Sequence, residues 1–221
     1  MEGFKDKNKL LFLLYEMLGM MILTIAFNMS HQYAILIIVV SIWAWDVSAA
    51  HFNPAITFGT FVMDTKDMSK LKDNLVPFLL LWLVQMIGAL AGILVTFLCS
   101  HIVYNGDAKT ITPSVSPLCP TGSIGGCLQN GLGWNLFFIE VVASFVLVFT
   151  YLIVRNVGVQ GDSAQWMAYV GPILLYFIYG GALSITGVTA NGPLNPALAL
   201  ELWFWSLGAY NNIPDPTNFP L

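Results

Sequence analysis

The tripeptide Asn-Pro-Ala occurs twice in this chain, and it constrains the fold more than any other feature of the sequence. The two copies are Asn53, Pro54 and Ala55 and, further along, Asn195, Pro196 and Ala197. Asparagine is a preferred helix N-cap and proline is favoured at the first helical position, so each copy predicts the start of a helix. The apolar stretch after each copy is about two to three turns long, which is too short to cross a bilayer core of roughly 30 Å. Both copies therefore predict half-helices.

The composition places these half-helices in a membrane. Hydrophobic residues make up 57% of the chain and charged residues 9%, against about half and about a quarter in soluble proteins. The first apolar run is long, contains Glu16 and lacks a small-residue cleavage site, so we expect a membrane span and not a signal peptide. The net charge of −4 comes from few residues and no basic amphipathic stretch is present, so no nucleic-acid partner is expected. The sequence predicts an integral, multi-pass membrane protein surrounded by lipid.

Five apolar stretches are read as full membrane spans. They cover roughly residues 10–27, 33–47, 77–99, 134–154 and 166–186. The residue before a proline is pushed out of helical geometry, so Asn53 marks a break in the chain at membrane depth. Irregular backbone at that depth is tolerated only where it is buried in protein or lines a cavity. The predicted fold class is an all-α membrane protein with five full spans and two re-entrant half-helices.

The chain divides into two half-repeats joined by a linker. Residues 104–133 are rich in Gly, Pro, Ser and Thr and form an outer linker loop between the half-repeats 1–103 and 134–221. Glu16 in the first span has a counterpart in Glu140 of the fourth span, and each is a lone carboxylate ahead of its half-helix. Because three spans separate equivalent elements, the second half is expected to be inserted with inverted topology.

Basic residues fall almost entirely on one face if each full span crosses the membrane and each half-helix returns to its own side. That face carries Lys5, Lys7, Lys9, Lys66, Lys70, Lys72 and Arg155, and the other carries Lys109. By the positive-inside rule, the N-terminus faces the cytoplasm or its organellar equivalent. Which membrane holds the protein is open, and an organellar inner membrane is among the alternatives. The opposite face receives the linker, where the spacing of Cys119 and Cys127 permits a disulfide without requiring one.

The inverted repeat brings the N-termini of the two half-helices together near the membrane midplane. Helix N-termini present partial positive charge and free N–H groups, and Asn53 and Asn195 project their amides toward a shared axis. Such donors suit water or a small polyol, whereas a cation or proton meets an electrostatic barrier. No nucleophile, metal cluster or phosphate-binding loop accompanies the motifs in the sequence, so we expect neither an enzyme nor a metal or cofactor site.

Four parts of the sequence carry a family resemblance. They are SAAHFNPAITFG, the run from Gln85 to Ala89, the pair Ile139 and Glu140, and LNPA. Together they resemble the aquaporins, the major intrinsic protein family of water and glycerol channels, from about residue 10 to residue 205. The resemblance implies an inverted repeat around a central pore, passive transport of water or small neutral solutes, and a homotetramer.

The resemblance also implies roles for individual residues. Asn53 and Asn195 would donate hydrogen bonds to permeating molecules, and Glu16 and Glu140 would accept hydrogen bonds from the re-entrant loops. A carboxylate inside a membrane is costly, and its duplication favours this supporting role over a protonated or helix-paired side chain. His51 would line the inner half of the pore, and a packed structural histidine is an equal alternative.

Two departures from the family pattern leave the function open. The family usually has an arginine directly after the second motif, where this chain has Leu198. The other filter positions fall at Tyr33, at Gly192 and at Leu183, or at Ala182 if the second loop carries one extra residue. Such a ring is apolar, and it is either wider than a water filter or a dewetted constriction. The second departure is that no sixth span follows the second half-helix, so either the chain is a fragment or a neighbouring subunit covers the seam.

Two functions are consistent with this pattern. In the first, the protein is a passive channel for water or small neutral solutes. In the alternative, it is a non-conducting, aquaporin-like structural subunit of a larger membrane protein complex. The paired motifs and the glutamates favour conduction, whereas Leu198 and the missing sixth span favour the structural role.

Overall fold

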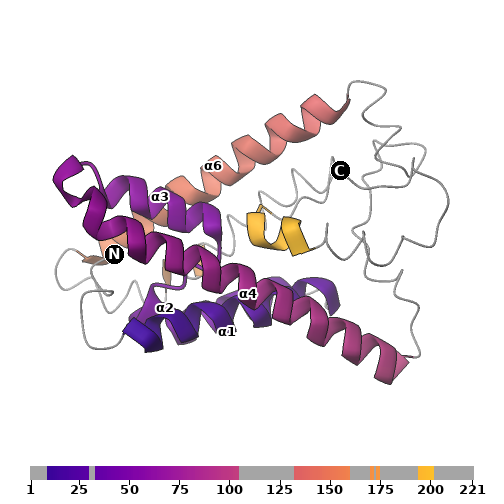
Figure 1. Ribbon diagram of the computed structural model, residues 1–221. Coiled ribbons are helices and arrows are strands. Elements are labelled where there is room, and N and C mark those ends of the chain that lie inside the picture. The colour runs from indigo at the N-terminus through magenta and orange to yellow at the C-terminus, as the bar shows by residue number, and fades with distance from the viewer. Residues whose placement is uncertain are drawn as a thin grey trace.

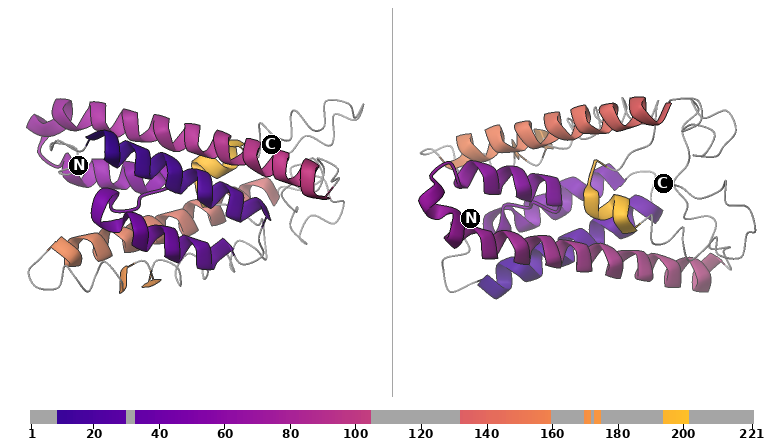
Figure 2. Two further views of the ribbon diagram at one scale, coloured as in Figure 1. Left: turned by 90° about the horizontal axis from the view of Figure 1, so that it is seen from below. Right: turned by 45° about the horizontal axis from the view of Figure 1, so that its top comes forward.

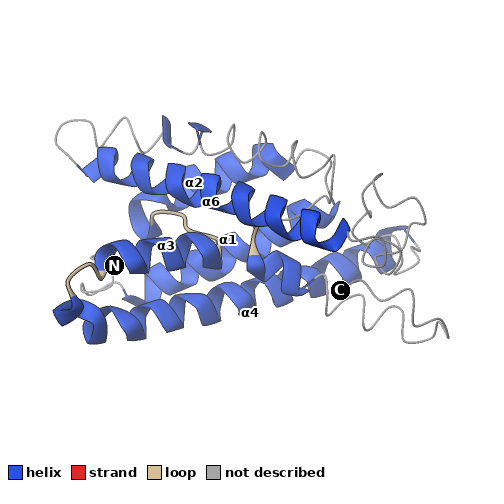
Figure 3. Cartoon of the chain, turned by 90° about the horizontal axis from the view of Figure 1, so that it is seen from above, coloured by secondary structure: helices blue, strands red, loops and turns tan. Residues whose placement is uncertain are grey.

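The computed structural model describes residues 9–29, 33–104, 132–159, 170–171, 173–174 and 194–201. Within these ranges every regular element is a helix, and no strand is present (Figure 3). The all-α class predicted from the sequence is confirmed for this part of the chain.

The elements follow one another as a series of long helices interrupted by a short one. In chain order they are α1 (Lys9–Met29), α2 (Tyr33–Ser48), α3 (Pro54–Asp64), the 3-10 turn η2 (Met68–Lys70), α4 (Leu71–Tyr104) and α6 (Leu132–Val159). A further helical segment covers 196–201. Among the described residues, Lys9–Met29 and Met68–Cys99 are long and apolar enough to cross a membrane by length and composition.

Two helices extend beyond the predicted spans. α4 begins at Leu71, ahead of the predicted start at Pro77. Pro77 lies in the second turn of α4, where it removes one backbone hydrogen bond of the helix. The turn η2, capped by the Asp67 side chain, leads directly into the first turn of α4. α6 is also longer than predicted at both ends, from Leu132 to Val159.

Two of the predicted segments are largely outside the described residues. The linker, 104–133, is described only at its two ends, which belong to α4 and α6. Of the predicted fifth span, 166–186, only 170–171 and 173–174 are described, and they are helical. The division into half-repeats therefore stays a prediction.

α1 and α4 pack against each other along their lengths, as Figures 1 and 2 show. The crossing is close at two glycines of α4. A Cβ on Gly88 would lie 2.4 Å from the carbonyl oxygen of Met17, and one on Gly92 would lie 2.7 Å from that of Met21. Because lipid is as apolar as leucine, helices in membranes associate through such small-xxx-small contacts and not through hydrophobic burial alone.

α3 and the segment 196–201 are the two half-helices. Both lie beside α4, and their N-terminal ends face each other near the middle of the molecule (Figures 1 and 2). α3 packs against α4 on one side and α6 on another. The long helices therefore form a wall around the point where the half-helices meet.

The main apolar cluster joins elements from both halves of the chain. Its buried members are Met20, Leu23, Val40, Ala44, Ala50, Phe52, Ala89, Ala197 and Leu198. They come from α1, α2, the loop after α2, α4 and the second half-helix, so their packing fixes the second half-helix against the first half. On the outer side of α4, Leu83 and Leu94 are 54% and 57% exposed, which suits a surface that faces lipid.

Gly88→Ala is expected to destabilise the protein, because the new methyl group meets a backbone oxygen that cannot rotate away. We expect a loss of about 1–3 kcal/mol, the usual cost of overpacking, seen as a lower midpoint of thermal unfolding in detergent. Leu90→Ala, on the exposed face of α4, is the control and should cost less. An unchanged midpoint for Gly88→Ala would contradict the close crossing of α1 and α4.

Candidate functional site

The loop between α2 and α3 turns the chain sharply at the first Asn-Pro-Ala motif. Ala49, Ala50 and Phe52 have φ values of 58°, 49° and 42°, a left-handed conformation that is uncommon for residues with a side chain. Asn53 returns to extended backbone with φ −157°, and its Oδ1 accepts a hydrogen bond from the Ala55 N–H at 2.8 Å. With Pro54 at the first helical position, the motif starts α3 as the capping rules predict.

A buried carboxyl group bonds to the backbone of this loop. Glu16 on α1 is 0% exposed. Its Oε1 accepts from the backbone N–H of His51 and its Oε2 from that of Phe52, both at 2.9 Å. Gln85 on α4 donates to Oε2 through Nε2, also at 2.9 Å. These three donors offset part of the cost of burying the carboxyl group, since charge-assisted hydrogen bonds are the strong ones.

The second motif repeats the local geometry of the first. Leu194, the residue before the asparagine, has φ 50°, as Phe52 does in the first copy. Asn195 accepts from the Ala197 N–H through Oδ1 at 3.1 Å. Each asparagine therefore caps its own half-helix with its side-chain oxygen, which leaves its amide NH₂ available for other hydrogen bonds.

The two amides cross and bond to the opposite loop. Asn53 Nδ2 donates to the carbonyl oxygen of Leu194 at 2.9 Å, and Asn195 Nδ2 donates to that of Phe52 at 2.8 Å. Asn195 Nδ2 also lies 3.7 Å from the sulfur of Met20. Both asparagines are 3% exposed. The left-handed residues Phe52 and Leu194 thus present their carbonyls to the asparagine of the other half.

The support of the second loop is weaker than that of the first. The Leu194 N–H donates to Glu140, but Oε1 of Glu140 is buried and has no hydrogen-bond partner. The sequence gives a reason, because the position equivalent to His51 is Pro193, which has no N–H. Among the described residues, Glu140 therefore accepts one loop hydrogen bond, where Glu16 accepts two. The supporting roles of both glutamates stay predictions.

His51 is packed on two sides. Its Nδ1 lies 3.2 Å from the Thr57 hydroxyl, and its ring meets that of Tyr151 edge-on with the centroids 5.4 Å apart. The side chain is 5% exposed. These are the contacts of a packed histidine, and a role in lining the inner pore stays a prediction.

Of the four predicted filter residues, the structure places one side chain. Leu198 is 0% exposed and belongs to the main apolar cluster. Tyr33 is the first residue of α2, and its side chain is not among the described ones. Leu183, Ala182 and Gly192 lie outside the described residues, so the filter ring stays a prediction.

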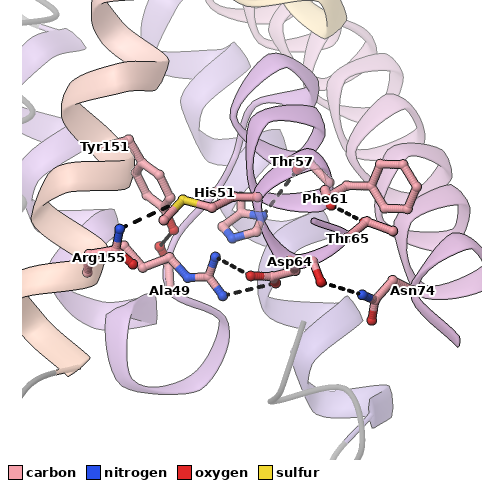
Figure 4. Close-up of polar contacts among 11 residues, drawn as sticks. Ala49, His51, Thr57, Phe61, Asp64, Thr65, Asn74, Tyr151 and Arg155 are labelled. Carbon is pink, nitrogen blue, oxygen red and sulfur yellow. Dashed lines mark hydrogen bonds and ion pairs between the residues drawn. The ribbon is translucent and has the colours of Figure 1, made fainter. Parts of the chain in front are cut away.

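An ion pair joins the C-terminal end of α3 to α6 (Figure 4). Arg155 donates through both terminal nitrogens to Asp64, at 3.3 Å and 3.2 Å. Partial burial alone would raise the pKa of the Asp64 carboxyl, but nearby positive charge, Arg155 included, outweighs it and holds the pKa below its usual value. At neutral pH the pair is therefore charged, and Figure 4 shows Asn74 bonding the carbonyl of Asp64 as well.

Tyr151 is a structural contact that the sequence did not predict. Its hydroxyl donates to the carbonyl oxygen of Ala49 at 2.7 Å, and the side chain is 0% exposed (Figure 4). Tyr151 lies three turns after Glu140 on α6, so both side chains of that helix face the re-entrant loops. A polar aromatic residue at helical spacing from an intramembrane glutamate is the signal that points to it.

The remaining sequence features are the residue types that bind metals and the cysteines. Within the described residues there is no group of three or more His, Cys, Asp or Glu side chains that is able to hold a metal ion. Cys99 is a free thiol, and Cys119 and Cys127 lie outside the described residues.

Comparison with known proteins places the chain in a family. The sequence profile of the Major intrinsic protein family matches residues 12–206. Aquaporin TIP1-2 of Musa acuminata is 26% identical over 185 residues, and aquaporin TIP1-1 of Zea mays is 28% identical over 187. Each alignment covers 82% of this chain and 62% of the relative, so the chain spans about three fifths of the length of these relatives.

The chain belongs to the major intrinsic protein family. This confirms the predicted family and, together with the helical structure, the predicted aquaporin-like all-α membrane fold. The family is one of membrane channels and not of enzymes, as the sequence predicted.

Glu16→Gln is expected to loosen the first re-entrant loop. In the unchanged protein a backbone N–H donates to each carboxylate oxygen. In the variant one of these N–H groups faces the amide NH₂, which is also a donor, so one buried donor is left unpaired at a cost of about 1–3 kcal/mol. Hydrogen–deuterium exchange of residues 48–55 should become faster and the midpoint of thermal unfolding should fall. Asp46→Asn, which changes an exposed carboxylate on α2, is the control. If exchange in this segment stays as slow in Glu16→Gln as in the unchanged protein, the carboxylate is not what holds the loop.

Proposed function

We propose that this protein is a passive membrane channel for water or small neutral solutes, with the permeation pathway passing Asn53 and Asn195. The observation that carries the proposal is the crossing of the two amides where the half-helices meet. Asn53 Nδ2 has a second N–H that no described residue accepts, and an oxygen atom of a passing molecule is a suitable acceptor. The family of the chain and the names of its aquaporin relatives support the same reading.

The electrostatics of the site favour neutral solutes. Two helix N-termini direct partial positive charge at the same point. A neutral molecule gains hydrogen bonds from the asparagine amides, whereas a cation is repelled and finds no carboxylate in the described contacts of either asparagine. Selection by charge at this point needs no arginine.

The half-repeats 1–103 and 134–221 are joined by the linker 104–133, and the N-terminus lies on the cytoplasmic or equivalent side. The filter is formed by Tyr33, Leu183, Gly192 and Leu198. The protein assembles in the lipid bilayer as a homotetramer, with neither a cofactor nor a nucleic-acid partner.

A second candidate function is supported by the burial of Leu198. The side chain stands where the family usually has an arginine, and it is fully enclosed by the main apolar cluster. If the permeation pathway runs beside the second half-helix, a leucine packed in this way obstructs it. In this alternative the protein is a non-conducting structural subunit of a larger membrane complex.

Osmotic swelling of liposomes tests conduction directly. Liposomes that contain the purified, folded protein should shrink or swell faster than empty liposomes when water or glycerol is the permeant. Permeability equal to that of empty liposomes would reject the channel. Purification of the protein as a stable complex with other subunits, together with no permeability, would establish the alternative.

Leu198→Ala is expected to raise the permeability of the liposomes severalfold, because it removes the bulk that encloses the pathway beside the second half-helix. Leu94→Ala, on the exposed face of α4, is the control and should leave permeability unchanged. If Leu198→Ala folds and assembles normally but conducts no better than the unchanged protein, Leu198 does not restrict the pathway.

A further inference from the structure

The crossing of α1 and the second half-helix contains a buried polar cluster. Asn28 on α1 donates through Nδ2 to the carbonyl oxygen of Thr24 at 2.9 Å and to Oε1 of Glu201 at 3.2 Å. Glu201 is 1% exposed and Thr24 is 0% exposed. Because both acceptors bond to the same nitrogen, Glu201 lies directly beside the turn of α1 that carries Thr24.

The equivalent crossing in the first half is apolar. Glu201 comes six residues after Asn195, and Gly59 comes six residues after Asn53. A Cβ on Gly59 would lie 2.4 Å from Cγ1 of Val148 and 3.6 Å from Cδ1 of Leu152, so this half-helix touches α6 closely. The fold therefore does not require polar side chains at such a crossing.

Val148 and Leu152 are themselves the counterparts of Thr24 and Asn28. Both pairs stand eight and twelve residues after the glutamates of their spans, Glu140 and Glu16. The crossing of α1 with the second half-helix thus has polar residues at the three positions where the crossing of α6 with α3 has glycine, valine and leucine.

Two polar atoms of the cluster have no partner. Oε2 of Glu201 and Oγ1 of Thr24 are buried and make no hydrogen bond. A threonine in a helix commonly donates to the carbonyl four residues before it, as Thr96 and Thr150 do at 2.9 Å, but Thr24 does not. Leaving a buried polar group unpaired costs about 1–3 kcal/mol, so two neighbouring ones point to a missing ligand.

In the described part of the chain, no group of the protein bonds to either of these two atoms. No basic side chain there forms an ion pair with Glu201. Protonation of Glu201 removes its charge but adds an O–H donor, and Oε2 forms no hydrogen bond with the hydroxyl of Thr24. A small molecule that lies between the two atoms is able to satisfy both, by donating to Oε2 and bonding to the hydroxyl of Thr24.

We propose that Glu201, Thr24 and Asn28 form a binding site for one small molecule with two hydrogen-bond donors, either water or ammonium. Oε2 of Glu201 and Oγ1 of Thr24 accept its hydrogens, and the bond from Asn28 to Oε1 orients the carboxyl group. A buried water typically bonds to two to four polar groups that are otherwise unsatisfied, and ammonium presents the same donors with a compensating charge. Glu201 lies about one helical turn beyond Leu198 on the second half-helix.

The test is a structure of the full chain in lipid nanodiscs, at a resolution that shows ordered waters, for the unchanged protein and for Thr24→Val. The substitution keeps the shape of the side chain and removes its hydroxyl. We expect one peak within hydrogen-bond distance of both Glu201 Oε2 and Thr24 Oγ1, and loss of that peak in Thr24→Val. Thr150→Val, which removes a hydroxyl bonded within α6, is the control and should retain the peak.

Three results would overturn the proposal. They are the absence of the peak in the unchanged protein, a protein side chain bonded to either atom, and a peak that persists in Thr24→Val. None of these results depends on conduction, so the proposed binding site is tested independently of the proposed channel function.

Two salts then identify the ligand. Ammonium donates hydrogen bonds, whereas tetramethylammonium has the same charge and no N–H. A higher midpoint of thermal unfolding in ammonium chloride than in tetramethylammonium chloride, seen for the unchanged protein but not for Thr24→Val, assigns the peak to ammonium. Equal midpoints in the two salts, with the peak present, assign it to water.

Discussion

The structure depends on a pair of reciprocal hydrogen bonds between its two half-helices. Each asparagine amide bonds to the carbonyl of the residue before the other asparagine, at 2.9 Å and 2.8 Å. That carbonyl is presented by a residue with positive φ, Phe52 or Leu194. Because all four groups are buried, loss of either bond leaves an unpaired donor and acceptor at a cost of about 1–3 kcal/mol each. The positive φ of Phe52 and Leu194 thus places the carbonyls that the buried asparagine amides need as acceptors.

The two halves share this arrangement but differ in what surrounds it. In the first half, Glu16 is saturated by two loop N–H groups and Gln85. In the second, Glu140 and Glu201 each retain a buried oxygen without a partner. The loop before the first half-helix is thus bonded to a carboxylate with three donors, whereas the second half-helix is held by apolar packing around Leu198. Function that differs from the family pattern is expected to reside in the second half.

Much of the fold followed from local chemistry in the sequence. The capping rules predicted helix starts at Pro54 and Pro196, because N-cap geometry is set within a few residues. The loop conformations could not be predicted in the same way. The burial of Leu198, the bond from Tyr151 to the first loop and the pairing of Asp64 with Arg155 depend on which helices become neighbours, which residue spacing alone does not determine. The bond from Asn28 on α1 to Glu201 depends on the same choice of neighbouring helices.

Solid-state NMR of the protein in lipid tests the central arrangement most directly. With ¹⁵N in asparagine side chains and ¹³C in the carbonyls of phenylalanine and leucine, two through-space contacts are predicted. One joins Asn195 Nδ2 to the Phe52 carbonyl, and the other joins Asn53 Nδ2 to the Leu194 carbonyl. Folded protein that shows neither contact, with both amides exchanging freely with water, would contradict the account.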